Sequence, residues 1–206
     1  MNARKQFDTQ IKQVFTPILQ ADGFVVNGNT SRRVIGEVIH VLALQGSIQG
    51  GQCCICLGIH LGFLPSVGTA AIDPEKIEEP ECEFRTRLAP PGKSDAWWNY
   101  GATESEARES AESITQFYQQ FGAPYFRRFS SFPDDFTSVT PEMFVNGGAL
   151  PFPLGGTFVR RALALARIAK RVGRTDEARQ FAEAGLARVG PAASLKPAFR
   201  QIIASA

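Results

Sequence analysis

The 206-residue sequence predicts an α+β fold: an antiparallel β-sheet of about five strands, packed by an N-terminal helix and by a helix after the sheet, with a helical hairpin following. Two long apolar segments within Val34–Pro65, joined by a Gly-rich connection, predict the central strands. Helical periodicity before and after them predicts the packing helices. The 44% apolar content, 16 Phe and 20% charged residues indicate a globular chain with a sizeable core.

The first helix is predicted over residues 3–21, where apolar side chains from Phe7 to Leu19 recur at helical spacing. Pro17 lies inside this stripe and lacks a backbone donor, so a kink or break is expected near Thr16. The pair Asp22-Gly23 is a stop signal. This helix is expected to cover one face of the sheet.

The strands are predicted from turn signals and alternation. Asn27-Gly28-Asn29 between Phe24–Val26 and Thr30–Ile35 predicts a hairpin. Val38–Gln45 and Cys53–Leu61 are apolar on both faces, so the central pair is expected to be covered on both sides.

A last strand and a helix are predicted next. The segment 82–88 alternates, which predicts that Glu83, Arg85 and Arg87 lie on a polar, outward face. Thr103 and Glu106 form a capping-box pattern for a helix that is expected to end at Gly122. A further short helix is expected over residues 124–132.

The chain is predicted to divide into a sheet domain (1–131), a Pro/Gly-rich connecting loop (132–155) and a C-terminal helical extension docked on the first domain (156–206). The segment LARIAKRVGRTDEARQFAEAGLARVGP resembles a single tetratricopeptide repeat. Such repeats need neighbours to bury their faces, so the hairpin is expected to dock on the sheet domain. The resemblance rests on Ala166, Gly173, Ala178, Ala182, Leu186 and Pro191.

Composition restricts the functional classes. The net charge of +2 is not that of a typical nucleic-acid-binding protein. The N-terminal segment lacks the apolar region of an export signal, and no run of about 18 apolar residues occurs, so a membrane span is not expected. The cysteine spacing is not that of a disulfide framework, which predicts reduced thiols and a cytoplasmic location.

The cysteines and histidines invite a metal-site hypothesis. Their spacing lacks the CxxC knuckles of zinc sites, so neither a metal nor a cofactor is predicted, and the cysteines are interpreted as small buried hydrophobes. Metal or redox use is the alternative. His40 and His60 are expected on one face of the hairpin, close across the strand pair, as structural histidines or as a two-histidine site with Glu37 or Cys56. The cysteines are Cys53, Cys54, Cys56 and Cys82.

Arginine and tryptophan form the most suggestive polar–aromatic group. Arg85 and Arg87 share one strand face and are soon followed by Trp97 and Trp98, and these residue types are enriched at protein–protein hot spots. The alternative is that the arginines pair with nearby acids while the tryptophans fill the core edge. The candidate binding set is Arg85, Arg87, Trp97, Trp98, His40, His60 and Gln45.

A basic helix face is a second candidate. Four arginines at helical spacing are expected to form a solvated face or a surface for an acidic partner. They are Arg160, Arg167, Arg171 and Arg174.

Several motifs resemble domain of unknown function 4304, a bacterial family: LQADGF, VIHVLALQGS, CLGIHLG, ECEFRTRL, the Trp97-Trp98 pair and FYQQFGAPYFRRF. They cover residues 1–130, about two-thirds of the chain, and none is catalytic. The resemblance implies an α+β fold without an established activity, and a role like that of small accessory or immunity proteins. Cys56 stands where the family's strand motif has an asparagine, so a family role for that side chain does not transfer.

The leading hypothesis is a non-enzymatic, cytoplasmic protein that binds another protein, as an immunity protein neutralising a bacterial toxin would. The main alternative is a small-ligand-binding protein or an enzyme with a pocket over the sheet, which requires His40, His60, Arg85 and Arg87 to converge on one cavity. A weaker alternative is nucleic-acid contact through the basic helix 160–174.

Overall fold

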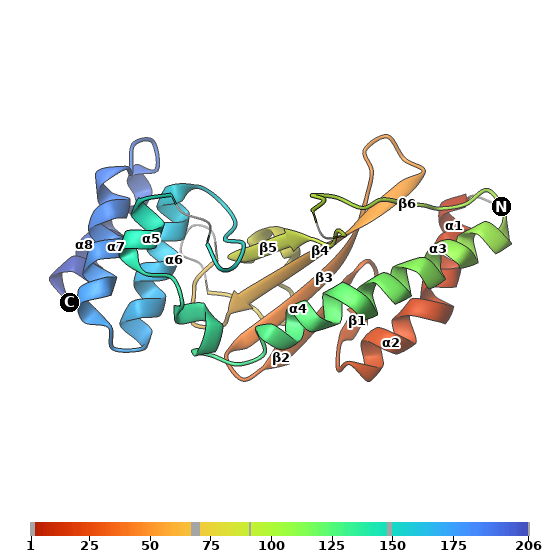
Figure 1. Ribbon diagram of the computed structural model, residues 1–206, viewed down its shortest axis with the longest axis horizontal. Helices are drawn as coiled ribbons and strands as arrows, with labels where there is room; N and C mark the ends of the chain where they lie inside the picture. The colour runs from red at the N-terminus through yellow and green to blue at the C-terminus, as the bar shows by residue number, and fades with distance from the viewer. Residues whose placement is uncertain (1–2, 67–70, 91, 148–149, 206) are drawn as a thin grey trace.

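The computed structural model describes residues 3–66, 71–90, 92–147 and 150–205. An open antiparallel sheet occupies the middle of an elongated molecule, the N-terminal helices lie at one end, and the C-terminal helices lie at the other (Figure 1). The predicted α+β class is confirmed.

The sheet has the strand order β1-β2-β3-β4-β5, with every neighbouring pair antiparallel. Five strands correspond to predicted segments. The sixth, which pairs with β4 beside β5, was not predicted because two residues carry no alternation signal. The strands are β1 (Val25–Asn27), β2 (Thr30–Ile35), β3 (Val38–Gly46), β4 (Gln52–Leu61), β5 (Phe84–Arg87) and β6 (Trp98–Asn99).

Two long helices, each interrupted by one π turn, pack on the sheet. Both π turns end shortly before a proline, Pro17 or Pro124, which then occupies the first turn of the next α segment, where a missing N–H needs no partner. The expected kink near Thr16 therefore takes the form of a π turn, and the helix continues to Ala21. The first helix comprises α1 (Ala3–Gln10), η1 (Ile11–Phe15) and α2 (Thr16–Ala21); the second comprises α3 (Glu104–Phe117), η3 (Tyr118–Gly122) and α4 (Ala123–Arg128).

The prediction that Gly122 ends the second helix is wrong. Gly122 lies inside the π turn, where a Cβ atom would come within 2.8 Å of the Tyr118 ring. The two π turns meet at Phe15 and Tyr118, both fully buried, with ring centroids 5.5 Å apart. The Tyr118 hydroxyl also donates a hydrogen bond to Asp22 at 2.6 Å, which fixes the second helix against the end of the first.

The strand register gives the sheet two distinct faces. One, the helix face, is covered by α1–α4 and carries Leu42, Leu57 and Ile59, all buried. The other, which we call the second face, carries Ile39 and Val41 in a smaller apolar cluster. From the register, its members include Arg32, Ile39, Val41, Gln45, Cys54, Cys56, Gly58, His60, Arg85 and Arg87.

An irregular segment, residues 72–82, crosses the second face, and we call it the strap. It contains the short 3-10 helix η2 (Glu79–Glu81), and its Ile77 and Cys82 pack on the apolar cluster of the second face. Gly58 permits this approach, since a Cβ atom there would lie 2.7 Å from the Cys82 sulfur. The prediction that Glu83 and Arg85 face outward is therefore wrong for Glu83, which is 6% exposed, and only partly right for Arg85.

The C-terminal helices pack against the sheet region through α6. Arg160 of α6 donates a hydrogen bond to the Glu83 carboxylate at 2.9 Å, and Arg171 pairs with Glu37. Residues 148–149 of the predicted connecting loop lie outside the described residues, as do residues 67–70 near the strap. The elements that follow α4 are η4 (Asp134–Thr137), α5 (Pro141–Val145), α6 (Phe158–Arg171), α7 (Thr175–Ala187), η5 (Ala193–Leu195) and α8 (Lys196–Ala204).

Candidate functional site

The strap leaves part of the second face open where the strands lie close to Asp95 and Trp97. We call this region the thiol–arginine patch; it consists of Gln45, Cys54, Cys56, Arg85, Arg87, Asp95 and Trp97. Gln45 pairs with Cys54 and Cys56 pairs with Arg87 in the strand register, so these side chains emerge on one face. A cavity of about 280 Å³ lies over the patch. It is lined by Gln45, Cys56, Glu79, Arg85, Thr86 and Arg87.

Both arginines of the patch are held by carboxylates. Arg85 binds Glu79 through two hydrogen bonds, of 2.8 and 3.0 Å. Arg87 donates to Asp95 at 2.6 Å, and its guanidinium lies 5.6 Å from the centre of the Trp97 ring. Glu79 and Asp95 were not in the predicted set because both come from irregular segments, whose position a strand pattern does not specify.

The two thiols of the patch point the same way from β4. The Cys54 and Cys56 sulfurs are 3.9 Å apart, and the Gln45 amide oxygen lies 3.3 Å from the Cys56 sulfur. Burial raises the pKa of the Cys56 thiol to about 12 and also raises that of Cys54. Both side chains are therefore neutral thiols near pH 7, and neither is an activated nucleophile.

The two histidines do not lie on one face, and that prediction is wrong. The register pairs Ile39 with His60 and His40 with Ile59, which places His40 on the helix face and His60 on the second face. In this register every even-numbered residue of β3 pairs with an odd-numbered residue of β4. Even-numbered residues of the two strands therefore lie on opposite faces of the sheet.

Each histidine is a buried group that bonds a backbone carbonyl. The Nε2 atom of His40 bonds the carbonyl of Phe129 at 2.8 Å, and that of His60 bonds the carbonyl of Leu64 at 3.0 Å. Burial lowers the pKa of His40 to about 4, with a smaller contribution from the charge of Arg33. Burial likewise lowers the pKa of His60. The convergence of both histidines with Arg85 and Arg87, which the alternative of a pocket over the sheet requires, does not occur.

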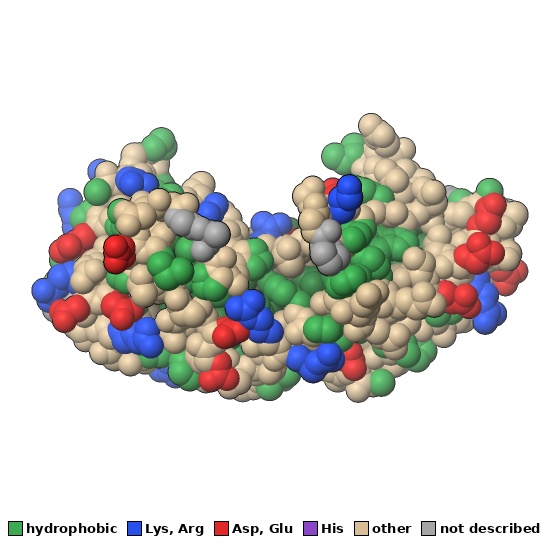
Figure 2. Space-filling view, in the orientation of Figure 1, with side chains coloured by type: hydrophobic (Ala, Val, Ile, Leu, Met, Phe, Trp, Pro, Cys, Tyr) green, Lys and Arg blue, Asp and Glu red, His purple; other side chains and the backbone are tan. Residues whose placement is uncertain are grey.

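The two tryptophans have different environments. Trp97 is 39% exposed beside Arg87. Trp98 is 8% exposed, donates to Ser113 at 3.1 Å and packs on Phe117. A shallow hollow of about 710 Å³ contains both rings together with Glu106 and Glu109. Figure 2 shows apolar side chains gathered between β6 and α3, and a deeper hollow between the C-terminal helices and the loop after β5.

The arginines of the basic helix face mainly contact the chain itself. Besides the pairs of Arg160 and Arg171, Arg174 donates to the Thr137 carbonyl at 3.0 Å. Burial lowers the pKa of Arg167, partly offset by the charge of Glu83. Arg160 and Arg167 therefore lie toward Glu83, whereas Arg171 and Arg174 remain about half exposed.

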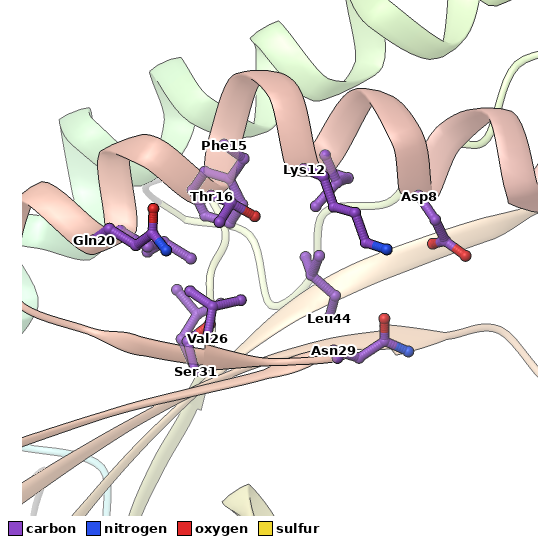
Figure 3. A pocket seen from close by; sticks show the side chains of 13 residues that line it. Asp8, Lys12, Phe15, Thr16, Gln20, Val26, Asn29, Ser31 and Leu44 are labelled. Atoms are coloured by element: carbon purple, nitrogen blue, oxygen red, sulfur yellow. The ribbon is translucent and has the colours of Figure 1, made fainter.

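A second cavity lies between the first helix and β1–β3 (Figure 3). Its volume is about 370 Å³. No sequence pattern predicts this cavity, because its size depends on the distance between the helix and the sheet. Phe15, Leu42 and Leu44 form its apolar wall, while Asp8 and Lys12 point into the opening at one end (Figure 3). Other lining residues are Ile11, Thr16, Leu19, Gln20, Val26, Gly28, Asn29 and Ser31.

The lining residues of the cavity under the first helix include one carboxylate, Asp8, and neither His nor Cys. Among the described residues, no three or more His, Cys, Asp or Glu side chains come together in a way that could hold a metal ion. A membrane-spanning helix is also missing from the part of the chain that the structure describes.

The fold and the patch define a class: an α+β domain with an open antiparallel sheet, helices on one face and a partly open opposite face. The comparison with protein families identifies the family. Residues 15–128, more than half of the chain, match the family described as Domain of unknown function (DUF4304), and the chain belongs to that family. Comparison with curated proteins and with solved structures finds no match.

Proposed function

We propose that this protein binds another protein and that the Arg87–Trp97 stack is the centre of the binding surface. One observation carries the proposal. Trp97 is 39% exposed and the Arg87 side chain 40% exposed, and the pair stands between the cavity over the thiol–arginine patch and the shallow hollow beside Trp98.

The stack has the physical properties of an interface anchor. Tryptophan and arginine contribute most to binding energy when a partner excludes water from them. The hydrogen bond to Asp95 and the ring contact hold Arg87 in place, so little side-chain entropy is lost on binding. The guanidinium already has a carboxylate partner, which lowers the cost of desolvating it.

The specific form of the proposal is an immunity protein that neutralises a bacterial toxin or effector in the cytoplasm. The family resemblance implies a role like that of small accessory or immunity proteins, which supports this form. The four free thiols support the cytoplasmic location. We do not extend the proposal to nucleic acid, because three of the four arginines that suggested it bond to their own chain.

Co-expression with the product of the adjacent gene tests the proposal. A stable complex should form, and calorimetry should show that Trp97→Ala and Arg87→Ala each weaken it by tenfold or more. Val145→Ala is the matched control, because Val145 is 41% exposed on α5. Equal affinities for all three variants would place the interface elsewhere, and absence of a complex would remove support for the immunity role.

A second candidate function, small-ligand binding, is favoured by the cavity under the first helix. Its volume lies in the range of ligand pockets, about 300–1,000 Å³, and its apolar wall with Lys12 at the opening suits an apolar molecule with an anionic end. An anionic naphthalene dye should bind with enhanced fluorescence. Leu44→Trp should abolish this binding by filling the cavity, whereas the exposed Ile48→Trp should not.

A further inference from the structure

Three polar atoms of the thiol–arginine patch form a compact triangle. The sulfurs of Cys54 and Cys56 are 3.9 Å apart, and the Gln45 Oε1 atom lies 3.3 Å from the Cys56 sulfur and 3.9 Å from the Cys54 sulfur. The two thiols come from alternate residues of β4, and Gln45 faces Cys54 across the strand pair, so the rigid centre of the sheet fixes all three positions.

These distances match the edges of a tetrahedral metal site. With metal–sulfur bonds of about 2.3 Å and a metal–oxygen bond of about 2.1 Å, a tetrahedral angle gives edges of about 3.8 Å between sulfurs and about 3.6 Å between sulfur and oxygen. The observed edges differ from these values by about 0.3 Å or less. An ion can therefore bind the three atoms with only small side-chain rotations.

We propose that Cys54, Cys56 and Gln45 bind a thiophilic d¹⁰ divalent metal ion of the Zn²⁺ or Cd²⁺ class. The two sulfurs and the amide oxygen are three ligands, and a water molecule in the adjoining cavity is the fourth. Each thiol releases its proton to solvent as its metal–sulfur bond forms. The described residues bring together no three His, Cys, Asp or Glu side chains for a metal ion, and the amide oxygen of Gln45 completes this donor set.

The charges around the triangle also suit a divalent ion. Two thiolates and one divalent ion sum to zero, so the occupied site carries no net charge into the buried strand. The nearby guanidiniums of Arg85 and Arg87 are held by Glu79 and Asp95 and so remain compensated in either state. The strand therefore does not need another counter-ion.

Cys53 provides a matched control on the same strand. Like Cys54 it is fully buried, but it faces the helix side in the main core. If the cysteines of β4 act only as small hydrophobes, all three behave alike toward a metal ion. If the triangle is a site, only Cys54 and Cys56 respond.

Titration of the reduced full-length protein with Cd²⁺ tests the proposal, because cadmium thiolates absorb in the ultraviolet. One equivalent should produce a charge-transfer band, and Cys54→Ala or Cys56→Ala should weaken binding at least tenfold, with Cys53→Ala unchanged. Gln45→Ala, a change at an exposed residue that keeps both thiols, should weaken binding less than loss of a thiol. Circular dichroism establishes that each variant is folded.

Alkylation of the wild-type protein gives a second measurement that needs no variant. All four thiols are buried, so labelling by iodoacetamide follows transient opening of the fold. Bound Zn²⁺ should slow the labelling of Cys54 and Cys56, read by mass spectrometry of peptides, more than that of Cys53 and Cys82. Absence of a saturable band, equal loss of binding in Cys53→Ala, or equal protection of all four cysteines would overturn the proposal.

Discussion

The two faces of the sheet are closed in different ways, although β3 and β4 are apolar on both. Regular helices cover the helix face, and large aromatic side chains such as Phe15 and Phe126 fill it. The strap covers the second face, and its backbone carbonyls, which no strand ladder pairs, require polar partners: Arg32 donates to the carbonyl of Ile77 at 2.7 Å and to that of Lys76 at 3.3 Å. Arg32 also donates to the Glu78 carboxylate at 2.6 Å. The irregular strap thus brings ion pairs into the layer over the second face, and the guanidinium groups of Arg85 and Arg87 stay partly exposed there.

The largest expected effect on the free energy of unfolding comes from shortening one isoleucine on each face of the sheet. Ile59→Ala on the helix face should lower the free energy of unfolding by about 4 kcal/mol, because tightly packed helices leave a cavity. Ile39→Ala on the second face should cost only about 2 kcal/mol, because the strap can move inward. Urea unfolding measures both. Equal costs would mean that the strap is as rigid as the helices.

The second largest effect should be a loss of stability at low pH, caused by His40 on the helix face. The folded-state pKa of His40, about 4, lies below its unfolded value of 6.5, so the unfolded chain takes up a proton first as pH falls. The stability due to neutral His40 is complete above pH 6.5 and declines by about 3 kcal/mol as pH falls to 4. His40→Gln should flatten this part of the curve of unfolding free energy against pH. An unchanged slope in the variant would assign the effect to other groups.

The ion pair between Arg160 of α6 and Glu83 should contribute somewhat less to the free energy of unfolding. Arg160→Ala leaves the buried Glu83 carboxylate without its partner and should cost about 2 kcal/mol at pH 7. Burial already raises the pKa of Glu83, so the penalty should shrink as pH falls through that raised pKa and the carboxylate becomes protonated. Arg161→Ala is the control, because Arg161, the next residue of α6, donates instead to the nearby Gly156 carbonyl. A penalty independent of pH would show that Glu83 is not responsible.

The closeness of strap and sheet predicts the smallest effect. Gly58→Ala brings a methyl group within 2.7 Å of the Cys82 sulfur and should cost about 1–2 kcal/mol. The double variant with Cys82→Ala should recover part of this loss. Gly62→Ala, whose nearest neighbour would be 3.6 Å away, should change the melting temperature little. A full cost in the double variant would argue against a steric cause.

Much of the fold was predictable because it is local. The hairpin at Gly28, the capping box at Thr103 and the apolar periodicity of the helices specify elements without reference to the rest of the chain. The π turns were not predictable from a proline pattern alone, because a kink and a π turn relieve the same clash. In the candidate site, Arg87 and Trp97 were anticipated as a group, whereas the role of Asp95 was not.

The sequence by itself determined the type and order of the strands and helices and the presence of two apolar faces on β3 and β4. Only the tertiary structure decided which residues share a face, because a change of one residue in the length of the connection between β3 and β4 exchanges the faces of an entire strand. That register separates His40 from His60 and places Cys54, Cys56 and Gln45 together. The partners of Arg85, Arg87 and Arg160 depend on the strap, the loop after β5 and the docking of α6, which are contacts between distant segments.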